Sequence, residues 1–215
     1  MERLPEKKEI SNYIIQSSED EIKRIAFELH EGVGQTLYSV FTGMQLLEAN
    51  MTDHESKHHV HEMNEILEKT IQEIRFLSVE LHPPTLSSLG FLPALKSYLN
   101  LYKATYGILV EVEQVGQEIL LPERHRIMLF RVCQEALGNI AKYADTHQVH
   151  IKLEWEKHGV AIVICDEGIG FDVEKNRHKP GLAVMYERMK LIGGNCVITS
   201  TLGKGTTIQL ELPLQ

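Results

Sequence analysis

Two long stripes of apolar residues constrain the fold of this chain more than any other feature of its sequence. The first runs through residues 10–50 and the second through residues 60–81, with apolar side chains every three or four positions. A polar segment at 49–56 separates them, and Pro83 and Pro84 follow the second. Such spacing places apolar side chains along one face of a helix, and proline ends a helix. The pattern predicts a helical hairpin.

A single hairpin cannot bury both stripes, whereas two hairpins packed as a four-helix bundle can. We therefore expect a homodimer and assign residues 1–84 to a helical dimerisation domain. No apolar run approaches the roughly 18 residues that a membrane span needs, and the N-terminus has no apolar segment of the signal-peptide type. Together with three widely separated cysteines, typical of a reducing compartment, these features predict a cytoplasmic chain without a membrane span.

The pattern changes after Pro84, and residues 85–215 form the second predicted domain. Helices mixed with mostly antiparallel strands predict an α+β sandwich, with helices on one face of a sheet. A net charge of −8 argues against direct nucleic-acid binding, which needs a basic face. It leaves room for a nucleotide, whose phosphates are met by Mg²⁺ and backbone N–H groups. The expected helices cover 93–102, 122–144 and 181–192, and the expected strands cover 108–115, 149–155, 160–166, 196–200 and 206–212.

One histidine on the first predicted helix has chemically suggestive neighbours. His30 is followed by Glu31 and, five positions on, by Gln35. A neutral imidazole can attack phosphorus, and it does so better when a carboxylate accepts or orients its proton. Glu31 and Gln35 share a helix face, where the amide can orient a water molecule. A single helical histidine usually has no such role, so this motif is weak by itself.

Two motifs in the second domain suit a nucleotide and its metal ion. Glu135 and Asn139 lie four positions apart on a predicted helix, and Mg²⁺ prefers oxygen ligands of these kinds. Asp166 ends an apolar strand, where its carboxylate can accept from an exocyclic amine. Gly168 and Gly170 follow it and permit tight turns and close backbone approach. Each motif alone is common in turns and on solvated helix faces.

Glycine-rich turns also precede the last helix, at Gly181, and the last strand, at residues 203–206. In this order, the motifs resemble the nucleotide-binding boxes of the GHKL ATPases. Residues 24–35 resemble the phosphoacceptor box of sensor histidine kinases of the DesK/nitrate-sensor-like subfamily, and residues 82–95 are similar to the linker of that subfamily. The resemblance extends from about residue 20 to the end of the chain, and five motifs in the same order make it specific.

The resemblance implies a dimeric four-helix bundle followed by a GHKL-type α/β sandwich that binds ATP and Mg²⁺. It implies a two-component kinase that phosphorylates His30 and passes the phosphoryl group to an aspartate of a response regulator receiver domain, with phosphatase activity toward that regulator. Glu31 would be the acid–base partner, Gln35 would position water, Glu135 would act as a base or through water, and Asn139 would hold Mg²⁺. The implied nucleotide-binding residues are Asn139, Lys142, Tyr143, Asp166, Gly168, Gly170, Gly181, Leu182, Gly203, Gly205 and Thr206.

Several positions depart from the subfamily pattern. Glu31 replaces an aspartate, Tyr143 replaces a histidine, and Lys179 and Val184 replace two glycines of the box next to the lid. A stiffer lid predicts slower nucleotide exchange or weaker binding. The alternative is therefore a catalytically weak ATP-binding dimer that acts as a regulator-binding or phosphatase module. A GHKL ATPase of another kind is a third possibility, against which the hairpin and its His-Glu-x-x-x-Gln motif argue.

Overall fold

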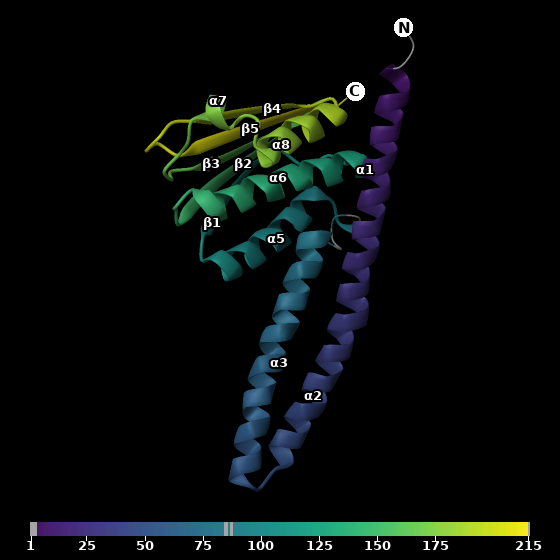
Figure 1. Cartoon of the computed structure of the whole chain (residues 1–215), viewed down its shortest axis with the longest axis vertical. Helices are drawn as coiled ribbons and strands as arrows, with labels where there is room; N and C mark the ends of the chain where they lie inside the picture. Colours follow the sequence, from purple (N-terminus) through teal and green to yellow (C-terminus); the bar gives the residue numbers. More distant parts are fainter. Residues whose placement is uncertain (1–3, 84–85, 87, 215) are drawn as a thin grey trace. The chain divides into compact units, whose positions relative to one another are not determined.

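The computed structural model describes residues 4–83, 86 and 88–214 (Figure 1). The chain divides into two compact units, Met1–Pro84 and Thr85–Gln215. The described part of the first consists of helices joined by a short loop, and the second combines helices with one sheet. The prediction of a helical N-terminal region followed by an α/β domain is confirmed.

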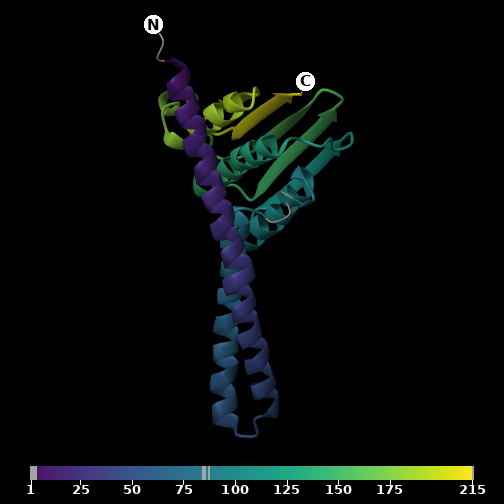
Figure 2. The same ribbon diagram turned by 90° about the vertical axis from the view of Figure 1, so that its right-hand side faces the viewer.

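The first unit is a hairpin of long helices. Helix α1 (Leu4–Phe27) continues through a π-helical segment, η1 (Glu28–Gly34), into α2 (Gln35–Asn50). After a short loop, α3 (His54–Leu81) runs back alongside α2, as Figure 2 shows. The Asp53 carboxylate caps α3 by accepting from the Ser56 N–H at 2.9 Å. Within the described residues, no helix is both long enough and apolar enough to cross a membrane.

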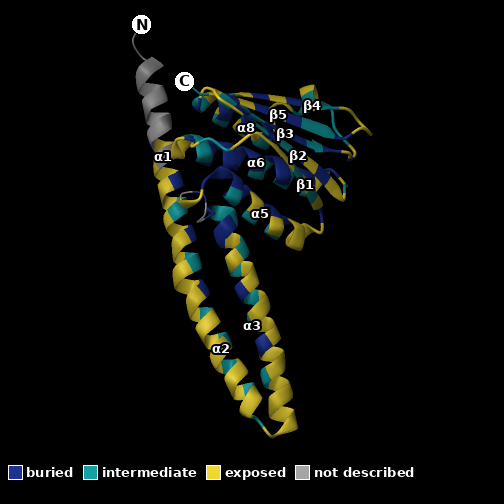
Figure 3. Cartoon of the chain, turned by 180° about the vertical axis from the view of Figure 1, so that it is seen from behind, coloured by how far each residue is buried: buried dark blue, intermediate teal, exposed yellow. Residues whose placement is uncertain are grey.

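Much of the hairpin is exposed (Figure 3), and the exposed residues include large apolar side chains. No described residue of α2 is buried, although this helix is rich in apolar side chains. One pair of helices covers only the strip along which they touch, so the remaining apolar side chains meet water. We call the exposed apolar residues that share one side of each helix the apolar face of the hairpin. They are Val40 and Leu47 on α2 and Met63, Ile66 and Leu77 on α3.

The second unit contains a five-stranded sheet with the order β1-β2-β3-β5-β4. Strands β2 and β3, β3 and β5, and β4 and β5 pair antiparallel, whereas β1 and β2 pair parallel. Parallel neighbours need a long crossover connection, and the segment between β1 and β2 supplies a helix for it. The strands are β1 (Leu109–Val115), β2 (Gln148–Glu156), β3 (Gly159–Asp166), β4 (Asn195–Ser200) and β5 (Thr206–Pro213).

Three helices cover one face of this sheet (Figure 1). They are α5 (Phe91–Tyr106), α6 (Glu123–Tyr143) and α8 (Pro180–Leu191). Burial alternates along the strands, so that every second side chain enters the core beneath the helices. A short helix, α7 (Val173–Asn176), was not predicted from the sequence, because four residues carry no measurable periodicity.

Hydrogen bonds between distant residues hold α5 in this unit. The Tyr102 hydroxyl is buried and donates to the Leu137 carbonyl of α6 at 3.0 Å. The Glu118 carboxylate accepts from the backbone N–H groups of Phe91 at 2.7 Å and Leu92 at 3.3 Å. The first N–H groups of a helix have no partner inside it and favour negative charge nearby. Glu118 therefore caps α5 from 27 residues along the chain.

Candidate functional site

The predicted phosphoacceptor motif lies on the π-helical segment of the first unit. π-Helical turns are rare and frequently occur at functional sites. The His30 side chain is 38% exposed, and its Nε2 lies 4.0 Å from Glu31 Oε1. That distance is too long for a hydrogen bond but close enough for attraction between charges. The other Glu31 oxygen, Oε2, accepts from the Gln35 side-chain amide. The fold thus brings the three residues of this motif together.

One neighbour of His30 is not evident from the sequence. Oγ of Ser78, near the end of α3, lies 3.3 Å from Nδ1 of His30. Ser78 is fully buried. The two residues are 48 positions apart in the chain, and no motif in the sequence connects them.

A cavity of about 530 Å³ lies in the second unit, within the size range of small-molecule sites. Residues of α6, the end of β3, the loop that follows it, and the start of α8 form its walls. Gly168, Gly203 and Gly205 are not among the residues that line it. The predicted nucleotide-binding residues that line the cavity are Asn139, Lys142, Tyr143, Asp166, Gly170, Gly181, Leu182 and Thr206, together with Glu135.

The cavity also has an apolar floor that the motifs did not identify. Its side chains come from four elements: Ile140 from α6, Met185 from α8, Ile198 from β4 and Ile208 from β5. All four are buried. Their positions follow from the burial periodicity of each element, but sequence periodicity does not indicate that they meet around one space. An apolar floor with a few polar groups suits a flat heteroaromatic ring.

Asp166 is the buried acidic group of the cavity, with 2% of its surface exposed. Burial raises the pKa of its carboxyl, and hydrogen bonds from the backbone N–H groups of Gly168 and Thr206 act in the opposite direction. The Gly168 N–H donates to Asp166 Oδ1 at 2.8 Å. A buried carboxyl with a shifted pKa, lying in a cavity, is typical of a functional site.

Two glycines that do not line the cavity allow close backbone packing next to Asp166. Gly205 has φ of +76°, and a Cβ atom at this position would lie 1.9 Å from the Asp166 carbonyl oxygen. A Cβ atom on Gly168 would lie 2.1 Å from the carbonyl oxygen of Ala144. Because both contacts are with backbone atoms, side chains cannot be accommodated without movement of the loops. These glycines shape the site through packing of the backbone.

Glu135 and Asn139 lie one turn apart on α6, at the edge of the cavity. Asn139 Nδ2 donates to Glu135 Oε1 at 3.2 Å. This arrangement orients the amide so that Oδ1 remains for a cation, and carboxylate and amide oxygens are ligands that Mg²⁺ accepts. A Cβ atom on Gly181 would lie 2.3 Å from Glu135 Oε1. The first turn of α8 therefore approaches this pair closely.

Two lysines add positive charge to the wall of the same cavity. Lys142 extends from the last turn of α6, and Lys179 precedes the first residue of α8. Pro180 occupies the first position of α8, where its missing N–H has no helical partner to lose. The altered lid box thus forms the start of a regular helix, and Lys179 places a cation there.

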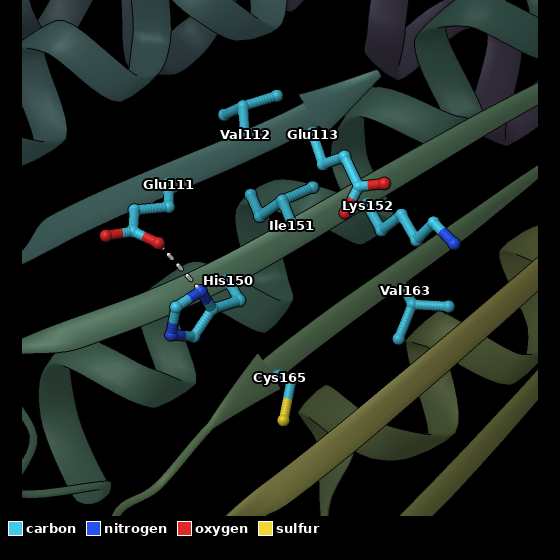
Figure 4. Close-up of a pocket in the computed structure, with 8 residues that line it drawn as sticks. All are labelled: Glu111, Val112, Glu113, His150, Ile151, Lys152, Val163 and Cys165. Carbon is cyan, nitrogen blue, oxygen red and sulfur yellow. Dashed lines mark ion pairs between the residues drawn. The ribbon is translucent and has the colours of Figure 1, made fainter. Parts of the chain in front are cut away.

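A second hollow, of about 260 Å³, lies on the opposite face of the sheet (Figure 4). Its charged side chains interact with one another or with neighbours on the same face. His150 Nδ1 lies 3.2 Å from Glu111 Oε2, and Lys152 Nζ lies 2.7 Å from Glu154 Oε1. These pairs leave the cavity between α6 and α8 as the better candidate for a charged ligand.

Two family models match separate parts of the chain. Residues 21–86 match the histidine kinase family HisKA_3. Residues 124–215 match the family HATPase_c, the histidine kinase-, DNA gyrase B-, and HSP90-like ATPases. The histidine kinase domain of the blue-light activated histidine kinase from Erythrobacter litoralis EL346 has a similar fold, with a TM-score of 0.51 and 13% identity, over 82% of this chain and 96% of that one.

Two curated proteins resemble the chain over nearly its whole length. The signal transduction histidine-protein kinase/phosphatase DegS of Brevibacillus brevis is 33% identical over 218 residues, which cover 100% of this chain and 56% of DegS. The oxygen sensor histidine kinase NreB of Staphylococcus carnosus (strain TM300) is 32% identical over 202 residues, covering 93% of this chain and 58% of NreB. The chain thus spans a little over half the length of these relatives. It has a HisKA_3 histidine kinase region followed by a HATPase_c domain, and both relatives are sensor histidine kinases of the nitrate-sensor-like subfamily.

Proposed function

We propose that this chain is an ATP-dependent protein-histidine kinase that phosphorylates its own His30. The observation that carries the proposal is the cavity of the second unit, where a buried carboxylate, Asp166, lies beside an apolar floor and the Glu135–Asn139 pair. The first unit supplies a partly exposed imidazole with an acidic neighbour. We assign residues 1–84 to dimerisation and histidine phosphotransfer, and residues 85–215 to ATP binding.

The cavity offers groups for each part of ATP. The Asp166 carboxylate would accept from the exocyclic amine of adenine, while the apolar floor would contact the ring. Lys142 lies on the wall that would face the phosphates. Asn139 Oδ1 would hold Mg²⁺, with Glu135 binding it through water or acting as a base. When bound, the ion neutralises charge on the phosphate oxygens.

Phosphoryl transfer to His30 would use Nε2, which makes no hydrogen bond to another described residue. Nε2 attacks the γ-phosphorus, and the Nε2–P bond forms as the bond between phosphorus and the ADP oxygen breaks. The ring becomes positively charged during this step. Glu31, 4.0 Å from Nε2, stabilises that charge. The Nδ1 proton then passes to water, which leaves a neutral phosphoimidazole. Because Glu31 lies beside Nε2 and Nδ1 faces Ser78, we assign Glu31 this electrostatic role in place of the acid–base role that the family resemblance implies.

The phosphoryl group would next pass to an aspartate of a response regulator receiver domain. Gln35 would position the water that hydrolyses the phosphorylated regulator. Its amide already donates to Glu31, which places it beside the acceptor histidine. The relative DegS is named as both a kinase and a phosphatase. These features support a bifunctional enzyme.

The apolar face of the hairpin supports a homodimer. Its residues extend along both helices and are largely exposed in one chain, whereas two hairpins can bury them in a four-helix bundle. We place the protein in the cytoplasm, where ATP is abundant and its three thiols, which are free in the structure, stay reduced.

The test is incubation of the purified chain with γ-labelled ATP and Mg²⁺, beside His30→Ala and His58→Ala variants. His58 is a matched control, because it is also a helical histidine with a glutamate neighbour, Glu62 at 3.5 Å. We expect acid-labile, base-stable label on the parent and on His58→Ala, and none on His30→Ala.

Two other outcomes would contradict the proposed kinase activity. Nucleotide binding by calorimetry without any label would support the regulator-binding or phosphatase module. Neither label nor binding would mean that only the fold is shared. Label that persists on His30→Ala would show a different acceptor.

A further inference from the structure

The Ser78 hydroxyl has a different kind of partner from other helical hydroxyls of the hairpin. Several donate to the carbonyl four residues earlier in the chain, and Ser78 instead lies 3.3 Å from His30 Nδ1. Ser78 is fully buried, and a buried hydroxyl is stable only with a hydrogen-bond partner. The contact therefore constrains both side chains. The hydroxyls that bond back along the helix belong to Thr36, Ser39, Thr42 and Thr70.

This contact bears on which nitrogen of His30 can react. A neutral imidazole carries one proton, and the nitrogen without it is the nucleophile. Nδ1 faces Ser78, so Nε2 is the nitrogen that can meet a phosphate. Nε2 must then hold the lone pair, and Nδ1 must donate its proton to Ser78 Oγ. The free histidine side chain prefers its proton on Nε2, which is the unreactive arrangement for this geometry.

We propose that Ser78 is a positioning residue that holds His30 as the Nδ1–H tautomer and directs the lone pair of Nε2 outward. This inference rests on the kinase function proposed above. After the transfer, the Nδ1 proton has passed to water, and the nitrogen becomes an acceptor. The same hydroxyl then donates to Nδ1. A hydroxyl suits both states because it can accept and donate, so it fixes the ring orientation before and after phosphorylation.

The test combines nitrogen-15 NMR of histidine-labelled protein with phosphorylation kinetics. The His30 signals are those that disappear in His30→Ala. Ser78→Ala removes the hydroxyl, Ser78→Thr retains it, and Thr70→Val is the matched control, because Thr70 lies on the same helix and bonds only to the Ile66 carbonyl among the described residues.

We expect a protonated Nδ1 in the parent, Ser78→Thr and Thr70→Val, and a protonated Nε2 or a mixture in Ser78→Ala. The rate of label incorporation at saturating ATP should fall about threefold to tenfold in Ser78→Ala, as for loss of one hydrogen bond. The ATP concentration for half-maximal rate should not change, because Ser78 is not among the residues of the nucleotide cavity. Ser78→Thr should restore the rate.

A protonated Nε2 in the parent, or an unchanged tautomer in Ser78→Ala, would overturn the inference. A rate loss in Ser78→Ala that Ser78→Thr does not restore would do the same, because it would indicate a packing effect. Absence of the proposed kinase activity would give a different result. The parent would then take up no label while its His30 signals still report the Nδ1–H tautomer.

Discussion

Two glycines in the loop before β5 allow backbone strain and steric overlap to be measured separately. Gly203 and Gly205 have nearly equal dihedrals, with φ of +75° and +76°. A Cβ atom on Gly203 would have no atom within 4 Å, whereas one on Gly205 would lie 1.9 Å from the Asp166 carbonyl oxygen. Alanine at either position must adopt the left-handed conformation, and alanine at Gly205 must also displace Asp166.

The expected magnitudes follow from these two contributions. Left-handed backbone costs an alanine about 1–2 kcal/mol at either site. An ordinary contact begins at 3.4 Å, so the Gly205→Ala variant must open a further 3.4 − 1.9 = 1.5 Å between backbone segments. Forced displacement of packed groups adds about 1–3 kcal/mol. We expect Gly203→Ala to lose about 1–2 kcal/mol of unfolding free energy and Gly205→Ala about 2–5 kcal/mol.

Urea unfolding followed by tryptophan fluorescence measures this difference. Trp155 is the single tryptophan of the chain and lies buried in β2, so its emission reports on the second unit. Nucleotide affinity should also fall more in Gly205→Ala, because Asp166 and Thr206 line the cavity beside the displaced loop. Equal unfolding free energies for the two variants would refute the reasoning, since they would show that the close approach to Asp166 is absent.

Two further predictions concern pH and assembly. Burial raises the pKa of Asp166. The unfolding free energy of the nucleotide-free protein should therefore decrease as pH rises from about 4 through that pKa. Asp166→Asn should remove this pH dependence from urea unfolding. Nucleotide affinity should change in the opposite direction, falling as the carboxylate is protonated at lower pH; calorimetry that shows no such fall would contradict an accepting role. Ile66→Glu, on the apolar face of the hairpin, should raise the dimer dissociation constant at least about thirtyfold, because each buried carboxylate costs about 1–3 kcal/mol or more. Light scattering over a range of concentrations checks this, with Leu120→Glu, an exposed position in the second unit, as the control; an unchanged dimer would place the interface elsewhere.

Local patterns in the sequence were sufficient to predict the main helices and strands. The stripes at residues 10–50 and 60–81 became α1, η1, α2 and α3, and the alternating runs became β1 to β5. These predictions succeeded because helix and strand periods repeat over neighbouring residues. The motif order also identified nine of the twenty residues that line the cavity, among them Asn139 and Asp166. Their chemical roles remain predictions for the experiments above.

The sequence by itself determined which segments are helical, which alternate, and which of them carry groups able to bind a nucleotide or accept a phosphoryl group. Only the tertiary structure decided that Ser78 meets His30, that Glu118 caps α5, and that α8, β4 and β5 complete the floor of the cavity. Each of these contacts joins residues far apart in the chain. Local periodicity records which face of an element is apolar, whereas the partner of that face depends on chain closure and packing.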